Sequence, residues 1–85
     1  MVDIVVPSLA ELEQVQFDSA AIREKAIKMG ADPDNMDTAD CDGKVLYSHF
    51  FRVATSSNLA DALQDAGYAN HGTKDVRLRR FMAIP

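Results

Sequence analysis

Apolar residues recur along this chain with two different spacings, which predict both helices and strands. Residues 2–6 are mostly β-branched and are stopped by Pro7, so they indicate an N-terminal strand. Ser8 and Glu11 then carry the signature of a capping box, in which each side chain accepts a hydrogen bond from the other residue's backbone amide. The apolar stripe of the short helix predicted here is Leu9, Leu12 and Val15.

A second helix is expected to begin at Asp18. Asp18 would be its N-cap, with Phe17 and Ile22 packed together as a hydrophobic staple. The apolar face of this helix is Ile22, Ala26 and Met29. Gly30 would end the helix in the left-handed conformation. Because no Gly or Pro interrupts residues 8–29, a single continuous helix is the alternative.

The second half of the chain is read as strand, helix and strand. Residues 31–43 form a polar, Asp-rich loop, within which Pro33 suits the first position of a short helical turn. Residues 44–55 alternate apolar side chains on both faces and predict a central strand. Ser57 or Asn58 would cap the next helix, and Gly67 would end it. The stripe of this helix is Leu59, Ala62, Leu63 and Ala66.

Residues 75–84 alternate again and predict a final strand. The expected fold class is therefore α+β, in the order β-α-α-loop-β-α-β. It has a small three-stranded sheet with two or three helices mainly on one face. The connection over 57–74 is long enough for a right-handed crossover, which favours parallel pairing of the last two strands. At 85 residues, the chain 1–85 is expected to form a single domain.

Charge is distributed unevenly between the two halves of this acidic chain, whose net charge is −4. Residues 1–43 hold ten acidic and three basic residues, a net charge of −7, whereas residues 44–85 hold three acidic and six basic residues, a net charge of +3. This asymmetry can steer a partner or favour head-to-tail pairing of copies in a homo-oligomer. The plainer interpretation is that the acidic loop folds back over the basic strand.

The C-terminal segment is the first candidate binding site. On the predicted strand, Arg77 and Arg79 share a face with Phe81. Two guanidinium groups beside an aromatic ring are typical of protein interfaces, and they can also hold phosphates and stack a base. Alternatively, this charge defends an edge strand against pairing with another sheet. A protein interface is favoured over nucleic acid because the chain as a whole is acidic.

The Asp-rich loop is the second candidate, with Asp34, Asp37 and Asp40 as contact residues. Its spacing fails the calcium-loop pattern, since Asp37 stands where that pattern requires Gly. No metal or cofactor is therefore expected. Cys41 with His49 or His71 would be a thiol–imidazole pair, but no local signature of a cysteine hydrolase surrounds Cys41.

These observations favour a non-catalytic, protein-binding module, such as an adaptor, an inhibitor or an assembly subunit, of the kind that bacteria and their viruses use as accessory proteins. One alternative is a nucleic-acid-binding regulator that uses the basic C-terminal strand. Another is an acidic mimic of nucleic acid that blocks a partner's phosphate-binding groove. A single cysteine and the lack of a long apolar run predict a cytoplasmic protein without a membrane segment.

Overall fold

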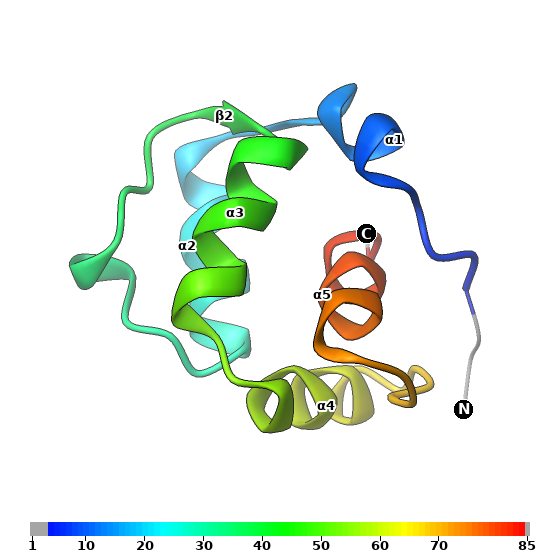
Figure 1. The fold of residues 1–85 in the computed structure, drawn as a ribbon. Helices are drawn as coiled ribbons and strands as arrows, with labels where there is room; N and C mark the ends of the chain where they lie inside the picture. Colours follow the sequence, from blue (N-terminus) through cyan, green and yellow to red (C-terminus); the bar gives the residue numbers. More distant parts are fainter. Residues whose placement is uncertain (1–3, 85) are drawn as a thin grey trace.

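The computed structural model describes residues 4–84 and is mostly helical, so the predicted three-stranded sheet is wrong. The elements are the helices α1 (Leu9–Glu13), α2 (Ser19–Lys28), α3 (Gly43–Val53), α4 (Ser56–Asp65) and α5 (Lys74–Met82), the 3₁₀ turn η1 (Pro33–Asn35), and the two-residue strands β1 (Gln16–Phe17) and β2 (Cys41–Asp42). In Figure 1, α2 lies behind α3, while α4 crosses below them and leads into α5.

The first half of the chain follows the predicted helix signals closely. The capping box forms, with the Glu11 amide donating to Ser8 Oγ at 3.2 Å and the Ser8 amide donating to Glu11 Oε1 at 3.4 Å. Asp18 caps α2 by accepting from the Ala21 amide at 2.8 Å. Gly30 follows α2 with a φ of +81°, a conformation that other residues adopt only with strain. Two separate helices therefore form, rather than one continuous helix over 8–29.

The strands predicted at residues 44–55 and 75–84 are wrong, because helices α3 and α5 form there instead. Asp42 caps α3, and the residues that α3 buries are Gly43, Leu46 and Phe50, which recur at helical rather than alternating spacing. Thr73 caps α5, whose buried residues are Leu78, Arg80, Phe81 and Met82. Residues 44–55 are rich in β-branched and aromatic residues, and residues 75–84 alternate, but burying one helical stripe against a common core outweighs these local patterns. At the N-terminus, residues 4–6 form no strand, and residues 2–3 of that expected strand lie outside the described part.

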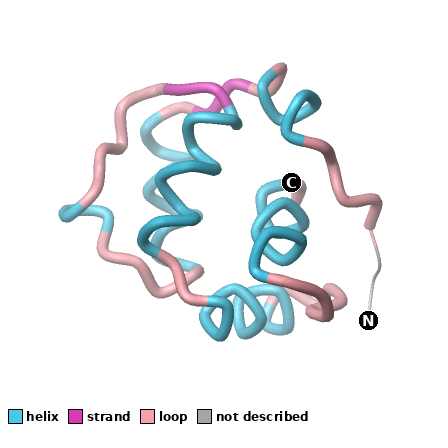
Figure 2. Tube along the Cα trace, viewed as in Figure 1, coloured by secondary structure: helices cyan, strands magenta, loops and turns pink. Residues whose placement is uncertain are grey.

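A small antiparallel pair replaces the expected sheet. Gln16 pairs with Asp42 and Phe17 with Cys41, which joins the segment before α2 to the segment before α3 (Figure 2). The Gly43 amide extends this contact by donating to the Val15 carbonyl at 2.9 Å. The pair thus fixes where α3 begins relative to α1.

The helices enclose one core of aliphatic and aromatic side chains. Its fully buried large members are Ile22, Met29, Leu46, Phe50, Leu59, Leu63 and Leu78. The predicted stripe of α4 is confirmed for Leu59, Ala62 and Leu63, although Ala66 is exposed and the cap is Thr55 rather than Ser57 or Asn58. Within residues 4–84, no helix is long and apolar enough to cross a membrane.

Candidate functional site

The basic residues near the C-terminus are largely engaged in internal hydrogen bonds. Arg77 Nε donates to the Asn70 carbonyl at 2.8 Å, and its Nη1 donates to Ser56 Oγ at 2.7 Å. Arg80 is only 2% exposed, and its Nη1 donates to the carbonyls of Ala69 and His71 at 3.1 and 2.7 Å. These two guanidinium groups hold the loop before α5 and the start of α4 in place.

Arg79 and Phe81 do not form a stripe with Arg77, because residues 74–82 are a helix. Arg79 makes a two-pronged ion pair with Asp75 on the preceding turn, with N–O distances of 3.1 and 2.7 Å. It also donates to the Pro7 carbonyl at 3.2 Å, which ties the N-terminal segment to α5. Phe81 is 2% exposed and belongs to the core. The predicted face of two arginines and an exposed ring is therefore wrong in its geometry.

The aspartates of the 31–43 segment mostly stabilise their own turns. Asp40 Oδ1 accepts from the Ser19 amide at 2.8 Å, and Asp37 Oδ1 accepts from the Ala39 amide at 2.9 Å. Asp34 is well exposed and pairs with Arg23 at 3.3 Å. Among the described residues, no three acidic, histidine or cysteine side chains are placed to hold a metal ion together.

The hypothesis of a thiol–imidazole pair gains no support from the surroundings of Cys41. Burial, followed by the charges of Asp42, Asp37 and Asp40, raises the pKa of the Cys41 thiol. A reactive cysteine needs the opposite shift, because the thiolate is the nucleophile. His49, in turn, lies 3.0 Å from a guanidinium nitrogen of Arg52 through its Nδ1.

A different cluster stands out on the surface between α3 and α5. The rings of Tyr47 and Phe51, one turn apart on α3, have centroids 5.7 Å apart. The Lys74 ammonium lies 4.5 Å from the centroid of the Phe51 ring, yet Phe51 remains 40% exposed. Tyr47 Oη donates to Asp75 Oδ1 at 2.5 Å, and Asp75 is also held by Arg79. We call the set Tyr47, Phe51, Lys74, Asp75 and Arg79 the aromatic surface.

Ionisation in the aromatic surface is fixed at neutral pH. Burial, together with the hydrogen bond to Asp75 and its charge, raises the pKa of Tyr47 to about 12. The hydrogen bonds from Arg79 and Tyr47 lower the pKa of Asp75. Tyr47 therefore stays protonated as a donor and Asp75 stays charged as an acceptor. Such a cluster is suited to holding a surface in one shape rather than to transferring protons.

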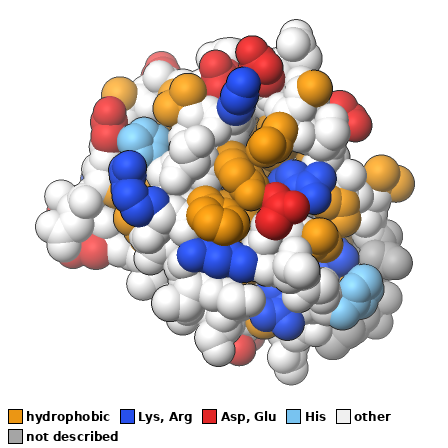
Figure 3. Space-filling model, in the orientation of Figure 1, with side chains coloured by type: hydrophobic (Ala, Val, Ile, Leu, Met, Phe, Trp, Pro, Cys, Tyr) orange, Lys and Arg blue, Asp and Glu red, His pale blue; other side chains and the backbone are white. Residues whose placement is uncertain are grey.

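The charge around the aromatic surface differs from that of the whole chain. Lys74 and Arg79 are basic, and Asp75 is the one acidic member of the set. Lys44 is exposed and precedes Tyr47 by three residues, so it lies on the same side of α3. Figure 3 shows hydrophobic side chains gathered at the centre of the face drawn, with Lys or Arg groups around them and an Asp or Glu group beside them. This part of an otherwise acidic protein is locally positive.

The sequence held a signal for the aromatic surface that the strand interpretation hid. Tyr47 and Phe51 are four residues apart, which places them side by side on a helix. Asp75 and Arg79 are also four residues apart and carry opposite charges, as in a helical ion pair.

Comparisons of the chain with protein families, with curated proteins and with solved structures find no match.

Proposed function

We propose that this protein is a non-catalytic protein-binding module that uses the aromatic surface to recognise another protein. The observation that carries the proposal is the exposed Phe51 ring, held between Tyr47 and the Lys74 ammonium. Aromatic and arginine side chains supply most of the binding energy in protein interfaces. A ring that is already fixed in the free protein loses little conformational entropy on binding.

The charge of the aromatic surface supports a partner of complementary charge. Because Lys74 and the neighbouring Lys44 are basic, while Arg79 is paired with Asp75, we expect the partner to present acidic side chains around an apolar contact. Charges at the rim of an interface mainly speed association and select the partner. The chain as a whole has a net charge of −4, so the surface away from these lysines is acidic and would repel the same partner and so orient it.

The two alternatives have less support. A nucleic-acid-binding regulator needs free basic groups, but Arg77, Arg79 and Arg80 each donate to internal acceptors. An acidic mimic of nucleic acid needs carboxylates in an array, whereas Asp37 and Asp40 accept from backbone amides within their own turns or at the start of α2. A cytoplasmic location is part of the proposal, in keeping with the single, unpaired Cys41.

The proposal is tested by affinity capture from nuclease-treated lysate with wild type, Phe51→Ala and Ile27→Ala. Ile27 is the matched control, because it is apolar, 63% exposed and lies on α2. We expect a dominant protein partner to be captured by wild type and Ile27→Ala and lost with Phe51→Ala, while all three proteins melt at similar temperatures. Truncating a central interface residue typically costs about 2 kcal/mol or more, roughly a thirtyfold loss of affinity.

Salt and charge reversal provide the second arm of the test. Lys74→Glu should slow association of the captured partner and weaken its dependence on ionic strength. Equal capture by wild type, Phe51→Ala and Lys74→Glu would overturn the assignment of the site. Loss of every partner on nuclease treatment would overturn the protein-binding function itself. If light scattering shows a dimer of this chain that Phe51→Ala dissociates, the partner at this surface is a second copy of the chain rather than a different protein.

A further inference from the structure

A second feature, apart from the aromatic surface, is a groove along α2. One cavity of about 300 Å³ lies between α2, α4 and the end of α5, and its apolar wall includes Ala62, Phe81 and Ile84. A second cavity of about 520 Å³ continues toward α1. Both cavities are lined by Ala21, Lys25 and Ile84, so they form one continuous groove. We call this the lysine groove, after the residue at its centre.

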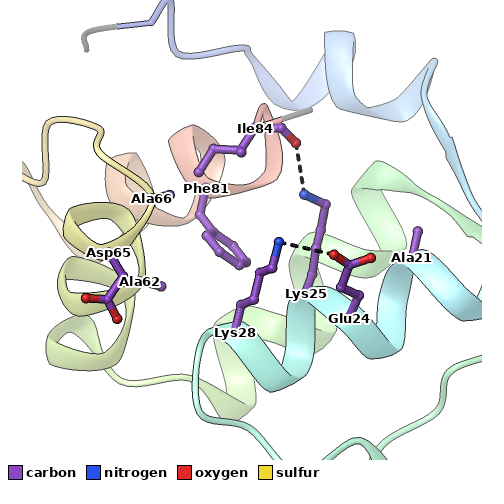
Figure 4. A pocket seen from close by; sticks show the side chains of 9 residues that line it. All are labelled: Ala21, Glu24, Lys25, Lys28, Ala62, Asp65, Ala66, Phe81 and Ile84. Carbon is purple, nitrogen blue, oxygen red and sulfur yellow. Dashed lines mark hydrogen bonds and ion pairs between the residues drawn. The ribbon is translucent and has the colours of Figure 1, made fainter. Parts of the chain in front are cut away.

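Lys25 projects into the groove from α2, as Figure 4 shows. Its ammonium donates to the Ile84 carbonyl at 3.0 Å and lies 5.3 Å from the centroid of the Phe81 ring. Lys28 also points into the groove from the next turn, with its ammonium 3.1 Å from Glu24. Two ammonium groups therefore enter the groove, one beside the Ile84 carbonyl and the other beside Glu24.

The surroundings of Lys25 penalise its positive charge. Burial lowers the pKa of Lys25, and the charge of Lys28 lowers it further, while Glu24 opposes both effects. An anion placed between the two ammonium groups would relieve their repulsion and offset the desolvation of Lys25.

Among the described residues, no acidic side chain that lines the groove forms an ion pair with Lys25. Glu24 is paired with Lys28, and the Asp65 carboxylate points away from both ammonium groups in Figure 4. Glu11, at the far end of the second cavity, is engaged in its capping box with Ser8. The electrostatic preference at the centre of the groove is therefore for an anionic group.

We propose that the lysine groove binds a single-chain aliphatic carboxylate. The carboxylate accepts hydrogen bonds from Lys25 and Lys28, and the chain runs along the second cavity. The wall of that cavity is almost wholly apolar and consists mainly of Pro7, Leu12, Val15, Phe17, Met82 and Ala83. The volumes of the two cavities lie in the range of small-molecule sites, about 300–1,000 Å³. This inference stands independently of the proposed partner.

The test compares three probes that share a ten-carbon chain and differ in head group: decanoate, decanol and decyltrimethylammonium, each below its micelle concentration or solubility limit. We expect calorimetry to detect decanoate binding that is about tenfold tighter than binding of decanol, as a charge-assisted hydrogen bond implies. The cationic probe should bind more weakly than either, because it would add a third positive charge beside Lys25 and Lys28. Equal affinities for decanoate and decanol would overturn the proposal.

Variants locate the site within the groove. Lys25→Gln should weaken decanoate binding about tenfold and leave decanol unchanged, whereas Lys44→Gln, an exposed lysine on α3, should change neither. Val15→Asp places a carboxylate in the path of the chain, and Val15 is 44% exposed, so the variant should fold and lose affinity for both probes. Decanoate binding that is unaffected by Lys25→Gln, or by Val15→Asp, would refute the placement.

Discussion

Replacing Gly43 with alanine is expected to destabilise the protein strongly. Gly43 is buried at the first turn of α3. A Cβ added there would lie far inside contact distance of the Leu12 carbonyl oxygen. It would also lie 2.9 Å from the Leu12 carbonyl carbon and 3.1 Å from the Leu12 Cβ. These are mostly backbone atoms, so relief requires α1 and α3 to separate. Separation would also strain the hydrogen bond from the Gly43 amide to Val15.

The size of this effect follows from the cost of overpacking, about 1–3 kcal/mol, with the upper end expected for a rigid backbone neighbour. In a domain of this size each kcal/mol shifts the melting temperature by about 4–8 °C, so we expect a fall of roughly 12–24 °C. Gly67→Ala is the control, because within residues 4–84 no atom outside its chain neighbours lies within 4 Å of its Cβ, and only the strain of a φ of +85° remains. That strain costs about 1 kcal/mol.

Thermal melts followed by circular dichroism would measure both variants. A Gly43→Ala protein that melts within 2–3 °C of wild type, or above Gly67→Ala, would refute this reasoning about the contact between α1 and α3.

Three further predictions concern polar groups. In an alkaline absorbance titration, Tyr47 should ionise with a pKa of about 12, and Asp75→Asn should move this pKa down toward 10.0. Because the folded state lowers the pKa of Asp75, its stabilising contribution is present above its ordinary value of 3.8 and is lost as the pH falls below it. The difference in urea midpoint between wild type and Asp75→Asn should therefore shrink in acid. Arg80→Leu should cost about 2–3 kcal/mol and speed amide hydrogen exchange in residues 66–73, since two carbonyls lose their donor.

Local signals in the sequence were enough to predict where the helices of the first half begin. The predicted stripe of the first helix is wrong apart from Leu12, because Leu9 is exposed and Val15 lies beyond α1. Ser8, Asp18 and Gly30 act within one turn of the chain, and each appears where its type predicts. Pro33 likewise begins η1. Capping depends on hydrogen bonds between near neighbours, so the sequence carries the information directly.

The secondary structure of the second half depended on which set of apolar positions is buried in the core, the alternating set of a strand or the helical stripe. In residues 44–55, alternate positions are apolar, but so are positions 46 and 50, which a helix places on one face. A sheet would have required partners for both strands, and no third strand forms among residues 4–84. The helical stripe instead packs against α1 and α5, a tertiary arrangement that single-sequence patterns do not specify.

The change from strand to helix also exchanged the roles of two aromatic residues. As a strand, residues 75–84 would have exposed Phe81 beside arginines; as a helix they bury it, and its ring becomes a wall of the lysine groove. Phe51, expected on a covered strand, is instead 40% exposed on α3.

Helix α5 contributes to both sites, but through different sides. Lys74, Asp75 and Arg79 belong to the aromatic surface, whereas Phe81 lines the groove. Residues two apart on a helix, such as Arg79 and Phe81, face different sides of it. A variant at Phe51 and a variant at Lys25 therefore change one site each, and neither removes a contact that the other site needs. Loss of partner binding and loss of carboxylate binding are therefore separable observations. If they failed together in both variants, the common cause would lie in the packing of α5 rather than in either surface.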